Sequence, residues 1–563
     1  MRVKGIGLSV FLIVIIINAT KIYSQSIPDS TARKIDSLFK TWDNNNSPGC
    51  AIGIIRNDSL IYAKGYGMAN LEYGIPVTAE TIFHMASISK QFTAYSIVLL
   101  AREGKLQLDD DIRKHLSWFP DLKEKITIRN LLNHTSGIRD QWQLLAISGT
   151  RLDDVITQEH IVKILGRQEA LNFSPGEQYS YSNSGFTTLA EIVRSVSGQS
   201  LRQFTDSAIF KPLGMNNTHF HDDYTEIVKN RSYSYERKDS AHYKNSILSY
   251  SNVGATSLFT NINDMSKWIM NFYDHKVGDQ KDIDLLTLKG KLNSGKELSY
   301  ASGIVSDTYN GWRQFSHGGA DAGYRTYVTV FPDLKMGFVI FSNLGDFNPG
   351  GKVYDIAGLF VRDTSKHKDL EMPKTPDSSK AFLKDTITIK KFTGSYISDD
   401  GMQLGFRLVN KKLYADAFGR SFLLLKKDKD TFSLFIDPGV KLSFSSNASG
   451  DTSVFAVVSS DEKHVLKKYI ADTSQPDHLL QAYTGTYYCP ELDCKYGISL
   501  KDHHLLLTNN KYDDTPLTLV GADHLINDFW WMGHLKIIRN NKNDITGFEV
   551  NNGRVMHLKF NKL

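Results

Sequence analysis

The stretch FHMASISKQFTAYSIVLL, residues 83–100, joins a serine and a lysine to a long apolar run. Phe92–Arg102 is mostly apolar and Gly104 follows it, which predicts a buried helix that ends there. Ser87 and Lys90 lie just before this run and three residues apart, so their side chains should share one face. A serine nucleophile needs a base and donors for a developing oxyanion. Burial would lower the pKa of the lysine amine, and Lys90 could then act as that base.

The Ser-x-x-Lys pattern alone is not specific, because the chain contains it four times. The copies are Ser37…Lys40, Ser87…Lys90, Ser365…Lys368 and Ser460…Lys463. Only Ser87 directly precedes a buried helix, whose N-terminal dipole and backbone N–H groups favour an anion. The other copies fall on an exposed-looking helix, in a linker and in a charged stretch. Ser87 is therefore the predicted nucleophile.

Residues 25–365 alternate strand-like and helix-like stretches, which predicts an α/β domain. Two hairpins are expected near its ends: Ala51–Ile55 with Leu60–Lys64, and Tyr324–Phe331 with Met336–Ser342. Mostly polar and helical sequence separates them, and a helix over Val353–Val361 closes the domain. Because strands lie at both ends, we expect one antiparallel sheet built from the two ends, with a helical insertion.

Residues 366–384 have the charged, proline- and serine-containing composition of a linker. Beyond it the chain consists of short strands and turns, and FTGSY at 392–396 recurs as YTGTY at 483–487. Several strand-length segments follow each copy. We therefore predict two small antiparallel β-barrels, over residues 385–472 and 478–563, which close to hide their edges. One continuous β domain is the alternative.

The first 24 residues have a basic start, the apolar run Val10–Ile17 and then small and polar residues, which is the pattern of a signal peptide. The run is short for a membrane span, which needs about 20 apolar residues. We expect cleavage near Ser24-Gln25 and an exported protein, periplasmic or secreted, without a stable membrane anchor. An uncleaved N-terminal anchor is the alternative.

Composition excludes some classes of partner. The formal net charge of +5 is small for 563 residues, which argues against nucleic acid or a membrane surface. Cys50 begins an apolar run and is expected to be buried, whereas Cys489 and Cys494 are close enough to bridge a tight loop. No Cys/His cluster has metal-ligand spacing, so neither a metal site nor a cofactor is predicted. The sequence does not indicate an oligomeric state.

Four stretches, taken in order, resemble the motifs of one known family. They are SISK at 87–90, IRNLLNHTSGI at 128–138, PGEQYSYSNSG at 175–185 and FSHGGADAG at 315–323. The family is that of the penicillin-recognising serine hydrolases: class C β-lactamases, DD-peptidases, D-aminopeptidases and related esterases. The resemblance covers about residues 28–365 and implies the β-lactamase/transpeptidase-like fold. The two following barrels are similar to the arrangement in D-stereospecific aminopeptidases, where extra domains shape the cleft.

The resemblance implies a role for each matching residue. Ser87 would form an acyl-enzyme, Lys90 would hold or receive its proton, and Tyr181 would shuttle protons. Asn183 would donate a hydrogen bond to the substrate amide, and the backbone N–H groups of Ser87 and Ala320 would form the oxyanion hole. A second Tyr-Ser-Asn, at 250–252, runs into a glycine-rich loop instead of a helix, so Tyr250 is not expected to be catalytic. His134 in the second stretch is expected to be a structural turn residue.

The third motif, expected on an edge strand, departs from the β-lactamase pattern. His317-Gly318-Gly319 stands where many penicillin-recognising enzymes have Lys-Thr-Gly. A histidine is mostly neutral at pH 7, so its hold on a substrate carboxylate should be weaker. Arg325 would restore such an anchor if it faces the site, or lie outward on its strand if it does not.

The predicted function is hydrolysis of amide or ester bonds in a small molecule or short peptide. Short peptides that contain D-amino acids, such as cell-wall fragments, are the favoured substrates. The alternatives are a broad-specificity esterase, a β-lactamase, and a family member that binds ligands but has lost catalysis. The aromatic stretch Phe529–His534 in the second barrel is expected to lie in the barrel core.

Overall fold

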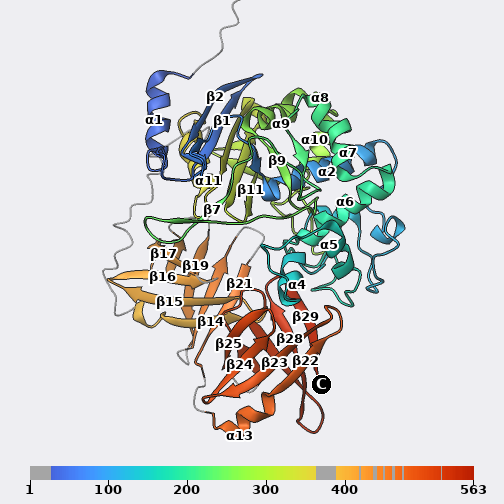
Figure 1. Cartoon of the computed structure of the whole chain (residues 1–563), viewed down its shortest axis with the longest axis vertical. Coiled ribbons are helices and arrows are strands. Elements are labelled where there is room, and N and C mark those ends of the chain that lie inside the picture. Colours follow the sequence, from blue (N-terminus) through green and yellow to red (C-terminus); the bar gives the residue numbers. More distant parts are fainter. Residues whose placement is uncertain are drawn as a thin grey trace, which may run out of the picture.

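The computed structural model describes residues 27–362, 389–417, 420–434, 440–447, 451–458, 463–471, 475–520 and 523–563. The predicted signal peptide, the predicted linker over 366–384, and the serines of two Ser-x-x-Lys copies, Ser365 and Ser460, lie outside the described residues. The described chain forms a mixed α/β domain followed by two β-barrels, which confirms the predicted fold (Figure 1). Within these ranges no helix has the length and apolar character to cross a bilayer.

The α/β domain is built on a six-stranded antiparallel sheet. Its order is β10-β11-β12-β13-β1-β2, so the first strands of the domain pair with its last. The bounds are β1 Cys50–Arg56, β2 Ser59–Tyr66, β10 Val305–Tyr309, β11 Trp312–Asp321, β12 Tyr324–Phe331 and β13 Met336–Ser342. Both predicted hairpins are present, β1–β2 and β12–β13, and β1 joins them through pairs such as Ile52 with Ile340.

Helices cover both faces of this sheet. On β1, Ile52 and Ile54 belong to the apolar cluster beneath α1 and α11, whereas Ala51 and Ile55 belong to the cluster on the opposite face. This alternation follows the two-residue period of a strand, and it buries β1 on both sides. The helices of the domain are α1 Asp29–Phe39, α2 Ser89–Arg102, α3 Ile128–Leu132, α4 Gln141–Ile147, α5 Gln158–Leu165, α6 Asn183–Ser197, α7 Leu201–Thr205, α8 Lys211–Leu213, α9 Ile262–Asp274, α10 Gln280–Thr287 and α11 Pro349–Ala357; the short α13 Asp477–Leu480 lies outside the domain, before the second barrel.

The last helix of the domain begins earlier than predicted, at Pro349 instead of Val353. The Asn348 side chain accepts a hydrogen bond from the Gly351 N–H and caps the helix, and proline is favoured at the first helical position. The helix also ends earlier than predicted, at Ala357. Three small sheets complete the domain: β3 Met68–Asn70 with β4 Ile75–Pro76, β5 Phe83–His84 with β9 Leu258–Thr260 and β6 His219–Phe220, and β7 Tyr235–Arg237 with β8 Tyr243–Asn245.

The C-terminal part forms two closed eight-stranded barrels rather than one continuous β domain. The first contains β14 Gly394–Ser398, β15 Gln403–Val409, β16 Lys412–Ala417, β17 Arg420–Lys426, β18 Thr431–Leu434, β19 Lys441–Ser446, β20 Thr452–Val457 and β21 Lys463–Tyr469. The second contains β22 Gly485–Cys489, β23 Cys494–Lys501, β24 His504–Asn509, β25 Tyr512–Leu519, β26 His524–Ile526, β27 His534–Arg539, β28 Ile545–Asn552 and β29 Val555–Lys562. Each closes by pairing its first strand with its last.

The repeated pentapeptide has the same structural role in both barrels. The buried Tyr396 donates its hydroxyl to the Phe392 carbonyl at 3.0 Å, and the buried Tyr487 does the same to the Tyr483 carbonyl at 2.6 Å. The tyrosine thus ties the first strand of each barrel to the segment that enters it. This satisfies a buried phenol and explains why the motif recurs.

All three cysteines are buried free thiols. Cys50 begins β1, as expected from its apolar context. Cys489 and Cys494 pair directly across the β22–β23 hairpin. The Sγ of Cys494 also lies 3.7 Å from the Ile147 carbonyl of α4, so this hairpin faces the α/β domain.

A buried arginine is central to the contact between the second barrel and the α/β domain. Arg139 follows the HTSGI stretch and is 1% exposed. Its guanidinium donates to Glu491 at 2.6 Å and to the carbonyls of Met556 and His557 at 2.9 Å. In Figure 1, β29 lies directly beside α4. A buried cation satisfied by one carboxylate and two carbonyls fixes the barrel at one position.

Replacing Arg139 with alanine is expected to weaken docking of the second barrel by about 3–5 kcal/mol, because Glu491 would remain as a buried carboxylate without its cation. Urea unfolding followed by tryptophan fluorescence measures the effect, since Trp530 and Trp531 belong to this barrel. Limited proteolysis should show faster cleavage between the α/β domain and the second barrel.

The matched control is Arg151→Ala. Arg151 also pairs with a carboxylate, Asp153, but both side chains are exposed. Because water screens exposed ion pairs, this variant should unfold like the wild-type protein. Equal behaviour of Arg139→Ala and Arg151→Ala would contradict the docking role of Arg139.

Candidate active site

Ser87 lies in a tight turn, Ala86–Ile88, directly before α2. Ala86 has a φ of +50°, a left-handed conformation that costs energy in any residue with a β-carbon. The turn lies against β11: a β-carbon on Gly319 would come within 2.3 Å of the Met85 carbonyl oxygen. Only glycine at position 319 therefore lets the strand approach the turn this closely. The half-buried Ser87 is held by a strained turn on one side and by a strand on the other.

Lys90 is completely buried and lies beside the Ser87 hydroxyl. Its Nζ is 3.1 Å from Ser87 Oγ, 2.8 Å from Asn183 Oδ1 and 2.8 Å from the Ala255 carbonyl oxygen. Burial lowers the pKa of Lys90 to about 7, against the opposing influence of Asp321 and Asp140.

The hydrogen-bond geometry suits the neutral form of this amine. A neutral amine has two N–H donors and one lone pair. The oxygens of Asn183 and Ala255 can only accept, so they take the two donors. The lone pair then faces the Ser87 hydroxyl. Lys90 is thereby arranged to accept the proton of Ser87.

Tyr181 lies on the other side of the lysine. The centre of its ring is 4.9 Å from Lys90 Nζ. Burial raises the pKa of Tyr181, and a side-chain hydrogen bond with Ser87 opposes the shift. Tyr181 is therefore a neutral phenol in contact with both the serine and the lysine.

The His134 ring packs against the Tyr181 ring, which agrees with the structural role expected for His134. The two ring centres are 4.1 Å apart, and His134 Nδ1 accepts a hydrogen bond from the Ser182 N–H at 3.2 Å. Burial, with a smaller effect of Lys90, lowers the pKa of His134 well below its usual value, so the ring is neutral. His134 thus positions the segment that carries Tyr181.

Asn183 begins α6 and is held by an acid that the sequence motifs did not single out. Asp140 Oδ2 accepts hydrogen bonds from the Asn183 backbone N–H and from its side-chain amide, both at 2.8 Å. The amide oxygen of Asn183 accepts from Lys90. Asp140 therefore orients the side chain that orients the lysine.

The third motif lies on β11, which is an edge strand only in part. Within the described residues, β10 pairs with Trp312–Ser316, and the register stops there. His317, Gly318, Gly319 and Ala320 thus run along an open edge that borders the cavity, with Ala320 exposed to it. Along its other edge, β11 pairs with β12.

His317 is buried and its two ring nitrogens are both engaged. Nδ1 lies 2.6 Å from the Gly318 carbonyl oxygen and Nε2 lies 2.9 Å from the Tyr300 hydroxyl. Because a carbonyl can only accept, Nδ1 carries the proton and Nε2 accepts from Tyr300. Burial, and secondarily Lys90, lowers the pKa of His317 to about 4. The neutral histidine expected from the sequence is therefore present, and it offers no positive charge.

Arg325 borders the same cavity but is turned toward its own backbone. Its Nη1 donates to the carbonyls of Ala322 and Tyr324 at 2.9 and 2.7 Å. Nearby, Asp321 accepts from Thr256 and lies 3.1 Å from His84 Nε2. The two hydrogen bonds of Arg325 to Ala322 and Tyr324 give it a role in holding the turn after β11.

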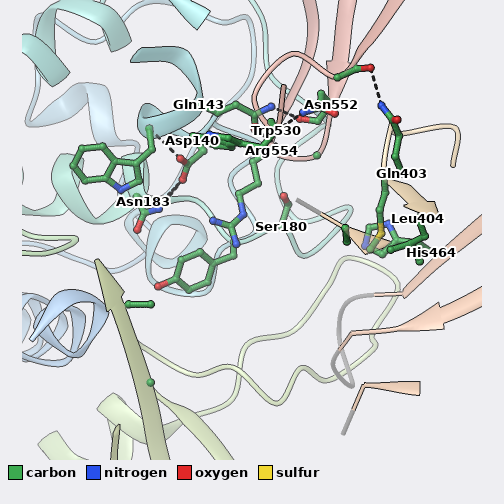
Figure 2. A pocket seen from close by; sticks show the side chains of 18 of the residues that line it. Asp140, Gln143, Ser180, Asn183, Gln403, Leu404, His464, Trp530, Asn552 and Arg554 are labelled. Carbon is green, nitrogen blue, oxygen red and sulfur yellow. Dashed lines mark hydrogen bonds between the residues drawn. The ribbon is translucent and has the colours of Figure 1, made fainter. Parts of the chain in front are cut away.

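A second cation reaches the site from the second barrel. Arg554 lies in the turn between β28 and β29, and its guanidinium carbon is 4.9 Å from the centre of the Tyr181 ring. Figure 2 shows Arg554 extending into the cavity near Asn183 and Asp140. The Arg554 carbonyl accepts from the Asp140 N–H at 3.1 Å, and its N–H donates to Gln143 at 3.2 Å. The α/β domain therefore holds this turn by its backbone and leaves the side chain in the site.

The cavity around Ser87 has a volume of about 2780 Å³ and is bounded by the α/β domain and both barrels. That is larger than the roughly 300–1,000 Å³ of a small-molecule pocket, so a short peptide fits. His464 of the first barrel and Trp530 of the second line it, far along the chain from Ser87 (Figure 2). Asp400 of the first barrel lines it as well. The placement of Trp530 corrects the expectation of a barrel-core residue, because its side chain is 40% exposed.

The other two residues considered from the sequence, Tyr250 and Ser37, lie apart from Ser87 and Lys90. Tyr250 is buried and stacks on Trp142 with ring centres 4.7 Å apart, where it borders the cavity without contacting Lys90. Ser37 lies on the surface of α1 and donates to the Lys34 carbonyl.

Three residues at the site were not found from sequence. Asp140 had a readable signal, because it caps the apolar helix α4. Tyr300 and Arg554 had no local signal that assigns them to the site. The tertiary fold alone brings them to it.

Comparison with known proteins identifies the family. The Beta-lactamase family model matches residues 35–361, more than half of the chain. A penicillin-binding protein of Bacillus subtilis is 24% identical over 416 residues, which cover 71% of this chain and 90% of that protein. A D-aminopeptidase of Brucella anthropi is 28% identical over 313 residues, which cover 55% of this chain and 58% of the aminopeptidase. The chain thus spans little more than half the length of that D-aminopeptidase.

Solved structures show the same fold. The octameric penicillin-binding protein homologue from Pyrococcus abyssi superposes with a TM-score of 0.54 at 24% identity, over 78% of this chain and 99% of that one. The matched family region contains Ser87, Lys90, Tyr181 and His317. The chain belongs to the Beta-lactamase family.

Proposed function

We propose that the protein is an exported serine hydrolase that cleaves amide or ester bonds through an acyl-enzyme on Ser87. The contact that carries the proposal is the one between Lys90 Nζ and Ser87 Oγ, at 3.1 Å, with the pKa of the buried Lys90 lowered to about 7 by its burial. An amine that is half neutral near pH 7 is well matched to general-base catalysis. The family match supports a hydrolase of this class.

In the proposed reaction, neutral Lys90 takes the hydroxyl proton as Ser87 Oγ forms a bond to the substrate carbonyl carbon. The backbone N–H groups of Ser87 and Ala320 would receive the oxyanion. The proton then passes by way of Tyr181 to the leaving amine or alcohol, the bond to which breaks. Water attacks the resulting ester, and its proton returns through the same groups, which frees Ser87. The high pKa of Tyr181 suits a relay that remains a neutral phenol between transfers.

We further propose that the substrates are short peptides with D-amino acids and a free carboxylate. The relatives named D-aminopeptidase and penicillin-binding protein support the class of substrate. Arg554 supports the carboxylate, because its guanidinium lies over Tyr181, the proposed proton relay. His317 is neutral and Arg325 donates to backbone carbonyls, so both are weaker anchors. Export rests on the signal-peptide pattern of residues 1–24.

Substitution of the nucleophile is the first test. Ser87→Ala should abolish the mass increase that a fluorophosphonate probe produces on the intact protein, whereas wild-type protein should be labelled on the peptide that contains Ser87. The matched control is Ser37→Ala, since Ser37 also precedes a lysine by three residues but lies exposed on α1. Undiminished labelling of Ser87→Ala would refute the assignment.

The lysine assignment predicts a definite pH profile. Protonated Lys90 cannot accept the serine proton, so kcat/KM should rise with pH and level off above the pKa of about 7. Between pH 6 and pH 8 the neutral fraction, and with it kcat/KM, increases about tenfold. His317, with its pKa near 4, stays neutral throughout this range.

Lys90→Ala should lower kcat by about 10²–10⁴-fold and remove this inflection. Lys40→Ala, at the exposed Ser-x-x-Lys copy, should retain both the rate and the profile. A wild-type profile that is flat between pH 6 and pH 8 would argue against Lys90 as the base.

Arg554 is tested with a matched pair of substrates, a D-alanyl peptide with a free C-terminal carboxylate and the same peptide as its amide. Arg554→Gln should lower kcat/KM for the acid about 10- to 100-fold relative to the amide. This factor corresponds to the loss of one charge-assisted hydrogen bond. Taking the ratio cancels any change in the pKa of Lys90.

The control is Arg539→Gln, in the same barrel, because Arg539 pairs with Asp523 away from the cavity. It should leave the ratio unchanged. An equal loss on acid and amide in Arg554→Gln would exclude carboxylate binding. Parallel assays with p-nitrophenyl esters and nitrocefin separate a peptidase from an esterase or a β-lactamase.

A further inference from the structure

A cluster of potential metal ligands lies outside the cavity, at the edge of the three-stranded sheet β5-β9-β6. It consists of His219 in β6, His221 immediately after it, and Glu226 in the following loop. His221 Nδ1 is 3.6 Å and His219 Nε2 is 3.9 Å from the same carboxylate oxygen, Glu226 Oε2. One atom from each residue, all three lying within 4.8 Å of one another, outlines a single small space.

The ring nitrogens at this space are buried and lack hydrogen bonds. His221 is 1% exposed, and neither of its nitrogens has a hydrogen-bond partner among the described residues. Nε2 of His219 is in the same state. A buried polar atom without a partner is costly, and in native proteins such atoms usually face a water or an ion. Two of them, His219 Nε2 and His221 Nδ1, lie beside the same carboxylate oxygen, and this indicates a bound species.

The donor set suits a cation. Two imidazoles and one carboxylate form a ligand set that zinc commonly takes.

Arg202 orients the Glu226 carboxylate and leaves some of its lone pairs available for a metal. It donates to Glu226 Oε2 at 2.6 Å and to Oε1 at 2.8 Å. A carboxylate has about four lone-pair positions, so positions for a metal remain on Oε2. Hydrogen-bonded outer partners of this kind are usual for ligating carboxylates. The Asp222 carboxylate, 2.9 Å from Arg202, offsets part of its positive charge.

We propose that His219, His221 and Glu226 bind a divalent transition-metal ion, zinc or one of similar preference. Two bonds of about 2.1 Å at a tetrahedral angle place the ligand atoms about 3.4 Å apart. The two separations from Glu226 Oε2, 3.6 and 3.9 Å, exceed this by a few tenths of an ångström, and all three ligand atoms lie within 4.8 Å of one another. Imidazole ligands disfavour calcium and magnesium, which prefer oxygen.

The position of the site indicates a structural role. The metal would join the loop that carries Glu226 to β6, which pairs with β9, which in turn pairs with β5. β5 ends at His84, three residues before Ser87. None of the three ligands lines the cavity, so the site does not depend on the proposed hydrolase function.

The test is zinc binding to the full chain, measured by competition with a chromophoric chelator after treatment with EDTA. We expect one tightly bound zinc ion per chain and a higher thermal unfolding midpoint with zinc than without it. His219→Ala and Glu226→Gln should each lower the affinity by about 100-fold or more, because each removes a ligand. His219 is partly exposed, which favours folding of its variant. Visible absorption of bound cobalt(II) gives a second readout of imidazole ligation.

The matched control is His242→Ala. His242 also lies 2.9 Å from a carboxylate, that of Asp239, but the pair is exposed and forms no cluster. It should bind zinc like the wild-type protein. Absence of zinc binding by the folded wild-type chain, or equal affinity in His219→Ala, Glu226→Gln and His242→Ala, would overturn the proposal. Neither result would bear on Ser87, whose labelling is measured separately.

Discussion

The arrangement of this molecule depends on the burial of one ammonium group, that of Lys90. Removing an amine from water is expensive, and here hydrogen bonds with three separate segments offset the cost: the Ser87 hydroxyl beside α2, the Asn183 side chain at the start of α6 and the Ala255 carbonyl before β9. Each segment must be in place for the lysine to be satisfied. The same burial lowers the pKa of Lys90 to about 7, so the energetic cost and the chemical usefulness of this residue have one cause.

Two consecutive residues connect this centre to the second barrel. Arg139 binds Glu491 and barrel carbonyls, while Asp140 holds both Asn183 and, through its backbone N–H, the Arg554 carbonyl. The chain after the HTSGI stretch is therefore shared between the site and the interface. A shift of the barrel would move Asp140, and through it the amide that bonds to Lys90. Barrel docking and lysine geometry are mechanically coupled by a single peptide.

The sequence predicted the features that depend on local pattern. The β1–β2 and β12–β13 hairpins follow from two-residue periodicity, and the apolar helix that follows Ser87 distinguished it from Ser37. The roles of Tyr300 and Arg554 depend on contacts between segments hundreds of residues from Ser87, and no local signal reports such contacts. His219 and His221 escaped a search for metal-ligand spacing because the third ligand is a glutamate in the next loop. The position of Trp530 was predicted wrongly because a run of aromatic residues has the same sequence pattern in a barrel core and on a cavity wall.

The distribution of positive charge explains why the barrel belongs to the site. His317 is neutral, so the open edge of β11 contributes no positive charge to the site. The cation over Tyr181 comes instead from Arg554, and it also contributes to the lowered pKa of Lys90, though less than burial does. The field at the nucleophile is therefore assembled from two domains. A chain that ended before the second barrel would keep Ser87 and Lys90 but lose Arg554, the cation over Tyr181. In the proposed function the α/β domain therefore supplies the reaction, and the barrel supplies part of its selectivity.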